Sequence, residues 1–252
     1  MRDDLGVEYL AGPPRRVVSL VPSATETIAL AAPWLLVGAT DYCDHPIDLA
    51  VPRVGGSKYP KLNAVLSCRP DLVVANAEEN RKSDVEELRA AGIAVWVSFP
   101  KTVPQACDSA AAMLAALGVG EPEWIGRARR LWTRAEPLTR SAVIPIWRKP
   151  WMVLGPGTFA GDVLARLGVS NVFDDSATPY PKTTVEDMLA RRPDLAVLPD
   201  EPYAFTADDG PEALAPLPCC LVSGRHLTWH GPSLVEAHEV LGRQLREATA
   251  AR

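Results

Sequence analysis

Short apolar runs alternate with amphipathic segments along most of the chain, bounded by proline, glycine and aspartate. The run over residues 16–21 is typical of a strand buried on both faces of a parallel sheet. Similar runs predict strands over residues 35–40, 72–75, 94–98, 143–147, 152–154, 195–198 and 220–223. Helical patterns predict helices over residues 24–32, 84–91, 159–167 and about 234–249. The alternation indicates an α/β fold with mainly parallel sheets.

Two helix boundaries carry clear local signals. Ser23 followed by Glu26 is a capping-box pattern and predicts that Ser23 caps the first helix. Gly92 and Gly168 come directly after helical segments, so we expect both glycines to end a helix.

The sequence contains an internal repeat. YPKLNAVLSCRPDLVVAN begins at Tyr59, and YPKTTVEDMLARRPDLAVLPD begins at Tyr180. Both copies give Tyr-Pro-Lys, a short helical stretch and Arg-Pro-Asp-Leu opening a strand. The repeat predicts two similar lobes.

A helical pattern lies between the two copies. Trp124, Ile125, Ala128, Leu131 and Trp132 recur at helical spacing, with arginines on the opposite side. We therefore predict three parts, namely an N-terminal α/β lobe over residues 1–120, a connecting helix over 121–141 and a C-terminal α/β lobe over 142–252. A helix of roughly 20 residues is about 30 Å long, enough to connect two lobes.

Several segments together resemble a known family. They are RVVSLVPSATE, LVGATDYCDHP, VPRVGG, RPDLVVAN and LRAAGIAVWV in the first half, and NVFDD and YPKTTVEDML in the second. Over residues 16–244 the chain resembles the helical-backbone metal receptor superfamily, the class III periplasmic binding proteins. It is most similar to the cobalamin-binding branch and its signal-less cytoplasmic relatives. The resemblance implies two lobes joined by one long backbone helix, with a corrinoid or related metal complex held in the cleft between them.

Composition narrows the partners and the location. The 252 residues include 47% hydrophobic and 23% charged residues with a net charge of −5, which argues against nucleic acid or an anionic membrane as the partner. The sequence shows no membrane span and no secretory signal, so we expect a cytoplasmic protein, or a periplasmic or lipid-anchored one if the true start lies upstream. The 5 cysteines do not resemble a disulfide framework.

Candidate ligand-binding residues follow from the rule that open parallel sheets bind ligands beyond the carboxyl ends of their strands. In the first lobe they are Pro22, Ser23, Tyr42, Cys43, His45, Glu78, Glu79 and Asn80. In the second they are Trp147, Arg148, Glu201, Tyr203, Phe205, Trp229 and His230. Aromatic faces together with polar groups suit a large, flat, amphipathic ligand.

Cys43 and His45 are candidate metal ligands, because thiolate and imidazole bind zinc, cobalt and iron. The alternative is that Cys43 packs as a small apolar residue while His45 caps the turn at Pro46. The glutamates are alternatively helix caps, and the two tryptophans are alternatively core residues.

We therefore expect a binding protein without catalysis that needs no catalytic cofactor, its partner being an ABC permease or a cytoplasmic protein. One alternative is a ferric-siderophore or heme receptor of an ABC importer. Another is a chelatase-like or cobamide-remodelling enzyme using Cys43, His45 and Glu78. A third is an interaction module that has lost its ligand. The sequence has neither a nucleophile elbow nor a glycine-rich phosphate loop.

Overall fold

The computed structural model describes residues 1–9, 12–137 and 139–250. The chain folds into two compact units. Unit 1 consists of Met1–Pro100, Pro104–Arg127 and His230–Pro232. Unit 2 consists of Lys101–Val103, Ala128–Trp229 and the chain from Ser233 onward.

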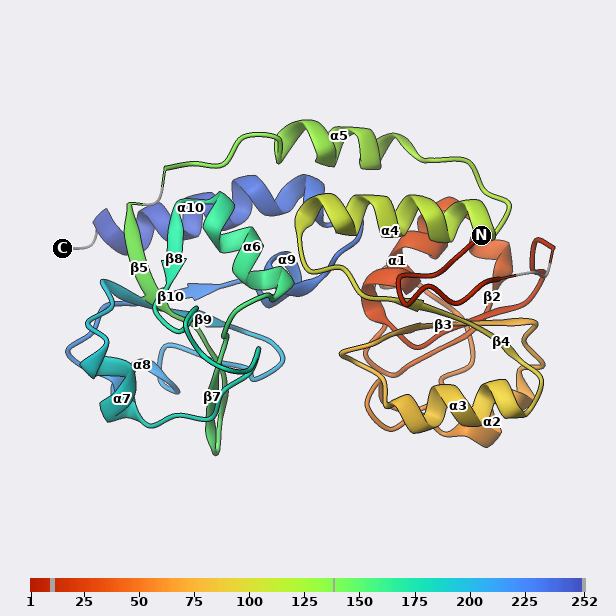
Figure 1. Cartoon of the computed structure of the whole chain (residues 1–252), viewed down its shortest axis with the longest axis horizontal. Coiled ribbons are helices and arrows are strands. Elements are labelled where there is room, and N and C mark those ends of the chain that lie inside the picture. Colours follow the sequence, from red (N-terminus) through yellow and green to blue (C-terminus); the bar gives the residue numbers. More distant parts are fainter. Residues whose placement is uncertain (10–11, 138, 251–252) are drawn as a thin grey trace. The chain divides into compact units, whose positions relative to one another are not determined.

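Unit 1 is built on a parallel sheet with helices on both faces. Its four strands have the order β2-β1-β3-β4 and every neighbouring pair is parallel. The strands are β1 (Val17–Ser19), β2 (Leu36–Ala39), β3 (Leu72–Asn76) and β4 (Ala94–Ser98). The helices are α1 (Pro22–Ala31), the 3-10 turn η1 (Pro33–Leu35), α2 (Leu62–Ser67), α3 (Lys82–Ala90) and α4 (Val103–Ala116). Helices α1 and α4 lie on one face of the sheet and α2 and α3 on the other (Figure 1).

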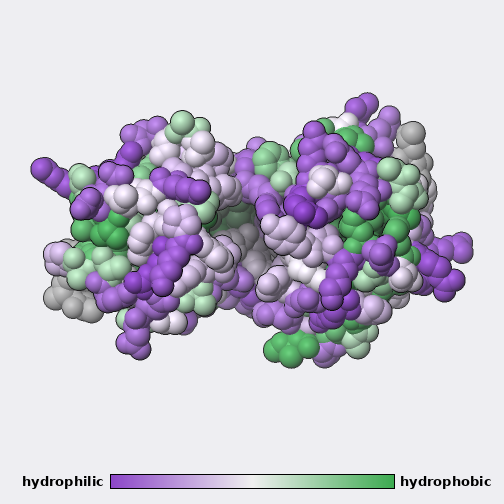
Figure 2. Space-filling model, turned by 90° about the horizontal axis from the view of Figure 1, so that it is seen from below, coloured by the Kyte–Doolittle hydropathy of each residue, from purple (hydrophilic) through white to green (hydrophobic). Residues whose placement is uncertain are grey.

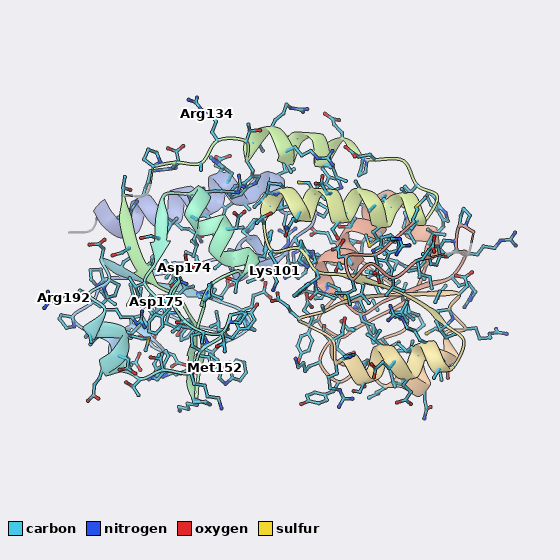
Figure 3. All side chains as sticks on the ribbon, viewed as in Figure 1. Lys101, Arg134, Met152, Asp174, Asp175 and Arg192 are labelled. Carbon is cyan, nitrogen blue, oxygen red and sulfur yellow. The ribbon has the colours of Figure 1, made fainter. Side chains whose placement is uncertain are left out.

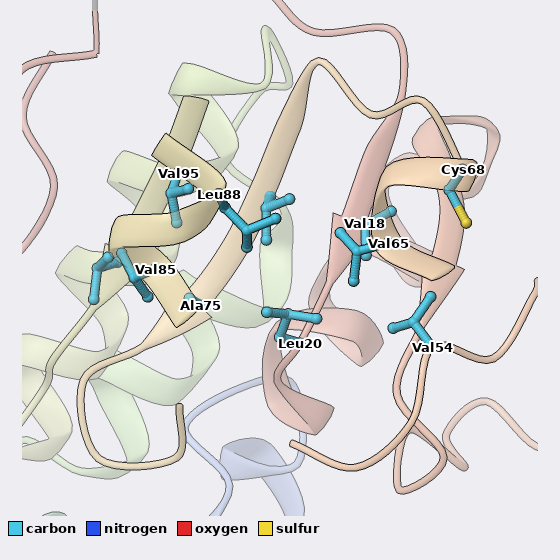
Figure 4. Packing of buried hydrophobic residues seen from close by; sticks show 11 residues of the cluster. Val18, Leu20, Val54, Val65, Cys68, Ala75, Val85, Leu88 and Val95 are labelled. Carbon is cyan, nitrogen blue, oxygen red and sulfur yellow. The ribbon is translucent and has the colours of Figure 1, made fainter. Parts of the chain in front are cut away.

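Alternation along the strands explains why these runs are almost wholly apolar. Val18 of β1, Val73 of β3 and Val95 of β4 face the core beneath α2 and α3, together with Val65 and Leu88 from those helices (Figure 4). The intervening strand residues are also buried, against the other layer of helices. A strand covered on both faces needs apolar side chains in both directions.

Unit 2 repeats this plan. Its four parallel strands have the order β10-β9-β5-β8. They are β5 (Arg140–Val143), β8 (Val169–Asn171), β9 (Leu195–Pro199) and β10 (Cys219–Val222), with the antiparallel hairpin of β6 (Pro145–Arg148) and β7 (Trp151–Val153) inserted after β5. The helices are α6 (Phe159–Arg166), α7 (Val185–Ala190), α8 (Pro211–Leu214), α9 (Gly224–Thr228) and α10 (Leu234–Ala250). Strands β5, β8, β9 and β10 thus take the places of β1, β2, β3 and β4, which confirms the predicted repeat.

The repeated Arg-Pro-Asp-Leu motif performs the same task in both units. Arg69 and Arg192 have left-handed backbone conformations (φ 47° and 52°) that turn the chain from a helix into a strand. In unit 1 the Asp71 carboxylate accepts the backbone N–H groups of Arg15 and Arg16 at 2.8 and 2.9 Å.

In unit 2 the Asp194 carboxylate accepts both the backbone N–H and the hydroxyl of Ser141, at 2.8 and 2.9 Å. The Arg192 side chain points outward from this turn (Figure 3). Each aspartate therefore ties the start of the central strand, β1 or β5, to the start of its neighbour.

The predicted capping box is wrong. The residue before α1 is Val21, which makes no side-chain cap, and Pro22 occupies the first turn. Proline at this position needs no N–H partner and has the backbone angle of a helix, so the helix can begin without a cap. The predicted glycine endings are confirmed, since Gly92 and Gly168 follow α3 and α6 with φ of 81° and 82°.

The helix predicted over residues 121–141 is much shorter. Helix α5 covers only Glu123–Leu131, and at 1.5 Å per residue it is about 14 Å long. Pro137 disfavours helical geometry at the residue before it. Glu136 instead donates its N–H to the Arg166 carbonyl at 2.8 Å, and the Trp132 indole donates to the Leu234 carbonyl at 2.8 Å.

Other elements also differ from the prediction, and strand β8 was not predicted. The strand expected over residues 143–147 is divided between β5 and the hairpin strand β6. Helix α4 has 14 residues and was not predicted, although Val103, Ala106, Ala110 and Met113 give it a buried stripe at helical spacing.

Large apolar side chains are also exposed on the surface. The most exposed are Ile47 at 92%, Trp34 at 73%, Tyr59 at 69% and Tyr42 at 67%. On the face shown in Figure 2, hydrophobic residues form small patches among hydrophilic ones. Within the described part of the chain, no helix is long and apolar enough to cross a membrane.

Candidate functional site

The strand order of unit 1 places a topological switch point at the carboxyl ends of β1 and β3. The crossover from β1 to β2 runs through α1 on one face, whereas the helices that lead to and from β3 cover the other face (Figure 1). Neighbouring strands whose connections leave on opposite faces open a crevice between them, where open α/β sheets bind ligands. Ser23 follows β1 and Asn76 ends β3, so both residues lie at this point.

His230 lies beside Ser23 and Asn76 at this edge of unit 1. Its Nδ1 lies 3.3 Å from the Ser23 hydroxyl and its Nε2 lies 3.3 Å from the Asn76 amide nitrogen. Because that amide can only donate, Nε2 accepts, and Nδ1 carries the ring proton. Burial lowers the pKa of His230 to about 4, so the ring is neutral at pH 7.

The His230 segment needs glycine at the next position. A side chain at Gly231 would place its Cβ only 2.8 Å from the Ser23 carbonyl oxygen. The absence of a side chain lets the segment lie directly on α1, which brings the His230 ring to Ser23.

Asn76 and Asn80 shape the loop that carries the predicted glutamates. The Asn76 side-chain oxygen accepts the backbone N–H groups of Glu78 and Glu79 at 2.8 and 3.2 Å. The Asn80 side chain accepts the Asn76 backbone N–H and donates to the carbonyls of Leu20 and Ser57. Asn80 is 4% exposed, so it holds the loop from below while the glutamates are half-buried above.

The three predicted residues after β2 have different environments. The Cys43 thiol is fully buried between the hydroxyls of Thr25 and Thr40 at 3.0 and 3.1 Å, and burial raises its pKa. His45 pairs instead with the Asp44 carboxylate at 2.9 Å. Tyr42 is exposed.

The carboxyl edge of unit 2 carries an aromatic cluster. Trp147 meets Tyr203 edge-on with ring centres 5.6 Å apart, and Tyr203 contacts Phe205 at 4.7 Å. Trp151 stacks on Phe205 with ring centres 6.0 Å apart. Phe205 is 3% exposed, whereas Trp147 is 42% exposed. The cluster thus has a buried base and one open aromatic face.

The predicted residues Glu201 and Trp229 pack around α9. A Cβ on Gly224 would lie 2.7 Å from the Glu201 backbone nitrogen, so the loop after β9 lies against the start of the helix. Trp229 is 7% exposed with the Arg225 guanidinium 5.6 Å from its ring centre, which makes it a buried residue.

Arg148 is held by protein groups. Its guanidinium donates to Asp209 and Glu212 and lies 5.5 Å from the ring centre of Trp151. Tyr203 donates its hydroxyl to the other Asp209 oxygen at 2.7 Å.

Several residues at the carboxyl edges of the two sheets were not identified from the sequence. Ser98 accepts a hydrogen bond from Asn76, and Asp209 and Glu212 hold Arg148. Trp151 could have been found from its place beside the predicted Trp147, whereas the pairing of Ser23 with His230 joins positions 207 residues apart. Among residues 1–9, 12–137 and 139–250, no three His, Cys, Asp or Glu side chains form a group that could hold a metal ion.

The chain is similar to several named proteins, although no protein-family model matches it. It is 29% identical over 193 residues to the vitamin B12-binding protein of Vibrio cholerae serotype O1, covering 73% of this chain and 70% of the relative. It is 28% identical over 204 residues to the vitamin B12-binding protein of Salmonella choleraesuis, covering 73% and 71%.

Solved structures share its fold. The periplasmic vitamin B12-binding protein of Vibrio cholerae superposes with a TM-score of 0.74 at 23% identity, covering 95% of this chain and 99% of that one. A periplasmic heme-binding protein in complex with two hemes gives a TM-score of 0.77 at 24% identity, covering 94% and 99%.

The repeated doubly wound units and the two superpositions show the class III periplasmic-binding-protein fold. In sequence the chain is similar to vitamin B12-binding proteins, the cobalamin-binding branch that the sequence analysis indicated.

Proposed function

We propose that the protein binds a corrinoid, using residues at the carboxyl edges of its two sheets. The similarity to vitamin B12-binding proteins over 73% of the chain carries this proposal. In unit 1 the proposed contacts are Pro22, Ser23, Tyr42, Glu78, Glu79, Asn80 and His230. In unit 2 they are Trp147, Glu201, Tyr203, Phe205 and Trp229.

The chemistry of the two edges supports a flat, amphipathic ligand. The Ser23 hydroxyl, which His230 holds in place, can donate a hydrogen bond of the kind that suits amide groups at a corrinoid periphery. Trp147 offers a ring face for stacking. The metal ion would arrive as part of the ligand, and its coordination by Cys43 or His45 stays a prediction.

Calorimetric and absorbance titration with cyanocobalamin, cobinamide, hemin and a ferric siderophore tests the proposal. We expect saturable corrinoid binding with a dissociation constant of about 1 μM or below. Trp147→Ala should weaken corrinoid binding about threefold to tenfold, since an aromatic contact contributes about 0.5–1.5 kcal/mol. Trp34→Ala is the matched control, because Trp34 is 73% exposed and lies in η1, outside the proposed contacts. Failure of both corrinoids to bind would refute the proposal.

The same titration separates the alternatives. Saturable binding of hemin or the ferric siderophore alone would favour the heme or siderophore receptor. A spectral shift of cobinamide that is lost in Cys43→Ala or His45→Ala would establish metal coordination. Conversion of a corrinoid into a new product by the wild-type protein would favour the enzyme.

Partner and location are also part of the proposal. The two solved structures compared above are named as periplasmic proteins, which supports action with an ABC importer. Recovery of the native protein in a periplasmic fraction would agree with that role. Recovery in the cytoplasm would favour storage or delivery to a cytoplasmic partner.

A further inference from the structure

Arg148, the arginine beside the aromatic cluster, is already paired with carboxylates of the protein. The Arg148 side chain is 19% exposed, and its guanidinium is paired with the carboxylates of Asp209 and Glu212. A guanidinium engaged by two carboxylates has a smaller attraction for a third than an unpaired one would have. Hydrogen bonds from the Arg148 guanidinium and from the Gly210 N–H lower the pKa of the Glu212 carboxyl, which is therefore ionised at neutral pH.

The same network fixes the open aromatic face. Asp209 accepts hydrogen bonds from both Arg148 and the Tyr203 hydroxyl. Tyr203 in turn contacts Trp147, the most exposed ring of the cluster. Arg148 is therefore a positioning residue for the stacking face.

The charge around this face is negative. Residues 200–212 contain Asp200, Glu201, Asp208, Asp209 and Glu212, and that segment has no lysine or arginine. The cations of this region are fewer: the hairpin adds Arg148 and Lys149, Lys182 forms a bridge with Met152 of β7, and the Arg225 guanidinium lies over the Trp229 ring. An excess of carboxylates lowers the local concentration of anions and raises that of cations.

The arginines at the carboxyl edge of unit 1 are also held by the protein. Arg53 donates to the carbonyls of Thr40 and Cys43 at 2.9 and 2.7 Å. Arg81 makes two hydrogen bonds with the carboxylate of Asp84, at 2.9 and 2.7 Å, while its guanidinium lies 4.8 Å from the ring centre of Tyr59. These side chains stabilise loops and are not directed to a ligand.

We propose that the protein selects its ligand by net charge, taking neutral or cationic metal complexes with a flat ring and rejecting those with a net negative charge, such as complexes with free carboxylates. This inference rests on the proposed function, because it specifies which metal complexes the same residues accept. Cyanocobalamin is a probe with no net charge, because its phosphodiester balances the cobalt corrin. Cobinamide, which lacks the phosphodiester, is a cationic probe, and hemin, with two propionates, is an anionic one.

Calorimetry with these three probes at low and high salt tests the inference. We expect both corrinoids to bind at least about tenfold more tightly than hemin at low ionic strength. Hemin binding should strengthen as salt screens the carboxylates, whereas cyanocobalamin binding should stay within about twofold.

Glu212→Gln removes one Arg148 partner without changing side-chain shape, and should strengthen hemin binding about threefold to tenfold relative to cyanocobalamin. Asp208→Asn is the matched control. It removes the same charge from the same loop, but the Asp208 hydrogen bond that the structure describes is made by its backbone N–H, which donates to the Thr206 hydroxyl. The change in hemin affinity should therefore stay below about twofold.

The outcomes distinguish this inference from the function on which it rests. Loss of binding to all three probes in the wild-type protein would refute corrinoid binding itself and the selection with it. Tight, salt-independent binding of both corrinoids and hemin would leave corrinoid binding standing and overturn the selection by charge. Equal effects of Glu212→Gln and Asp208→Asn on hemin affinity would overturn the role of Arg148. Both changes remove one negative charge, but only Glu212→Gln removes a partner of Arg148.

Discussion

Helix α9 approaches the loop after β9 so closely that position 224 has no room for a side chain. A Cβ on Gly224 would lie 2.3 Å from the Glu201 Cγ, 2.7 Å from its backbone nitrogen and 2.8 Å from its carbonyl oxygen. Two of these atoms belong to the backbone, so a rotation of the Glu201 side chain cannot relieve the overlap. Gly224→Ala must therefore displace either α9 or the loop that carries Tyr203.

Overpacking of this kind typically costs about 1–3 kcal/mol. For a domain of about 150–250 residues, each kcal/mol lowers the melting temperature by about 2–4 °C, so we expect a decrease of about 2–12 °C. Corrinoid affinity should fall as well, because the displaced loop positions Tyr203 beneath Trp147.

Differential scanning calorimetry and the cyanocobalamin titration measure the two effects. Gly120→Ala is the control, since a Cβ there would meet no atom within 4 Å. A Gly224→Ala protein that melts within 1 °C of the wild type would show that the contact is looser than the structure indicates. Normal melting with lost affinity would place Gly224 in the binding site itself.

Three further predictions concern titration, reactivity and the repeat. Folding lowers the pKa of His230 from 6.5 to about 4, so between these pH values the unfolded chain binds more protons than the folded one. The contribution of His230 to the free energy of unfolding is therefore fully present above pH 6.5 and decreases as the pH falls towards 4. Urea unfolding should show a smaller decrease of this free energy with pH in His230→Gln than in the wild type. The buried Cys43 thiol, with its raised pKa, should react with a thiol reagent at least about 100-fold more slowly in native protein than in urea, and rapid native labelling of Cys43 identified by peptide mass would contradict its burial. Asp71→Ala and Asp194→Ala should each destabilise the protein by about 1–2 kcal/mol in urea unfolding, because each leaves two donors without their acceptor, and a neutral result for one of them would break the structural equivalence of the two motifs.

The predictions from the sequence succeeded where the signal was local. Apolar runs between prolines and glycines located the four strands of the first sheet and strands β9 and β10 of the second, and the repeated Arg-Pro-Asp-Leu predicted the repeated fold. Strand β8 was missed, and the predicted strand over residues 143–147 overlaps β5 only at the last residue of β5. The length of α5 was overestimated because helical spacing continues to Trp132, while the contacts of Trp132 and Glu136 that end the helix come from distant residues. Such contacts compete with helix formation and leave no pattern in the local sequence.

The candidate site was predictable only in part for the same reason. The rule for carboxyl ends of strands selected Ser23, Trp147 and Tyr203 correctly as edge residues. It could not show that Ser23 faces His230, or that Arg148 is paired with Asp209 and Glu212. Pairing between distant side chains decides which polar groups remain available to a ligand, and this depends on the folded chain.

The equivalence of the two sheets has a consequence for how recognition changes over evolutionary time. Both units have the same strand order. The carboxyl edge of unit 1 nevertheless carries a serine, an asparagine and a histidine, while that of unit 2 carries tryptophan and tyrosine. The same frame thus carries polar side chains at the edge of the first sheet and aromatic ones at the edge of the second. In each unit the frame itself is held by buried apolar residues of the strands and helices. The residues at the strand ends can therefore change in either unit while its sheet is kept.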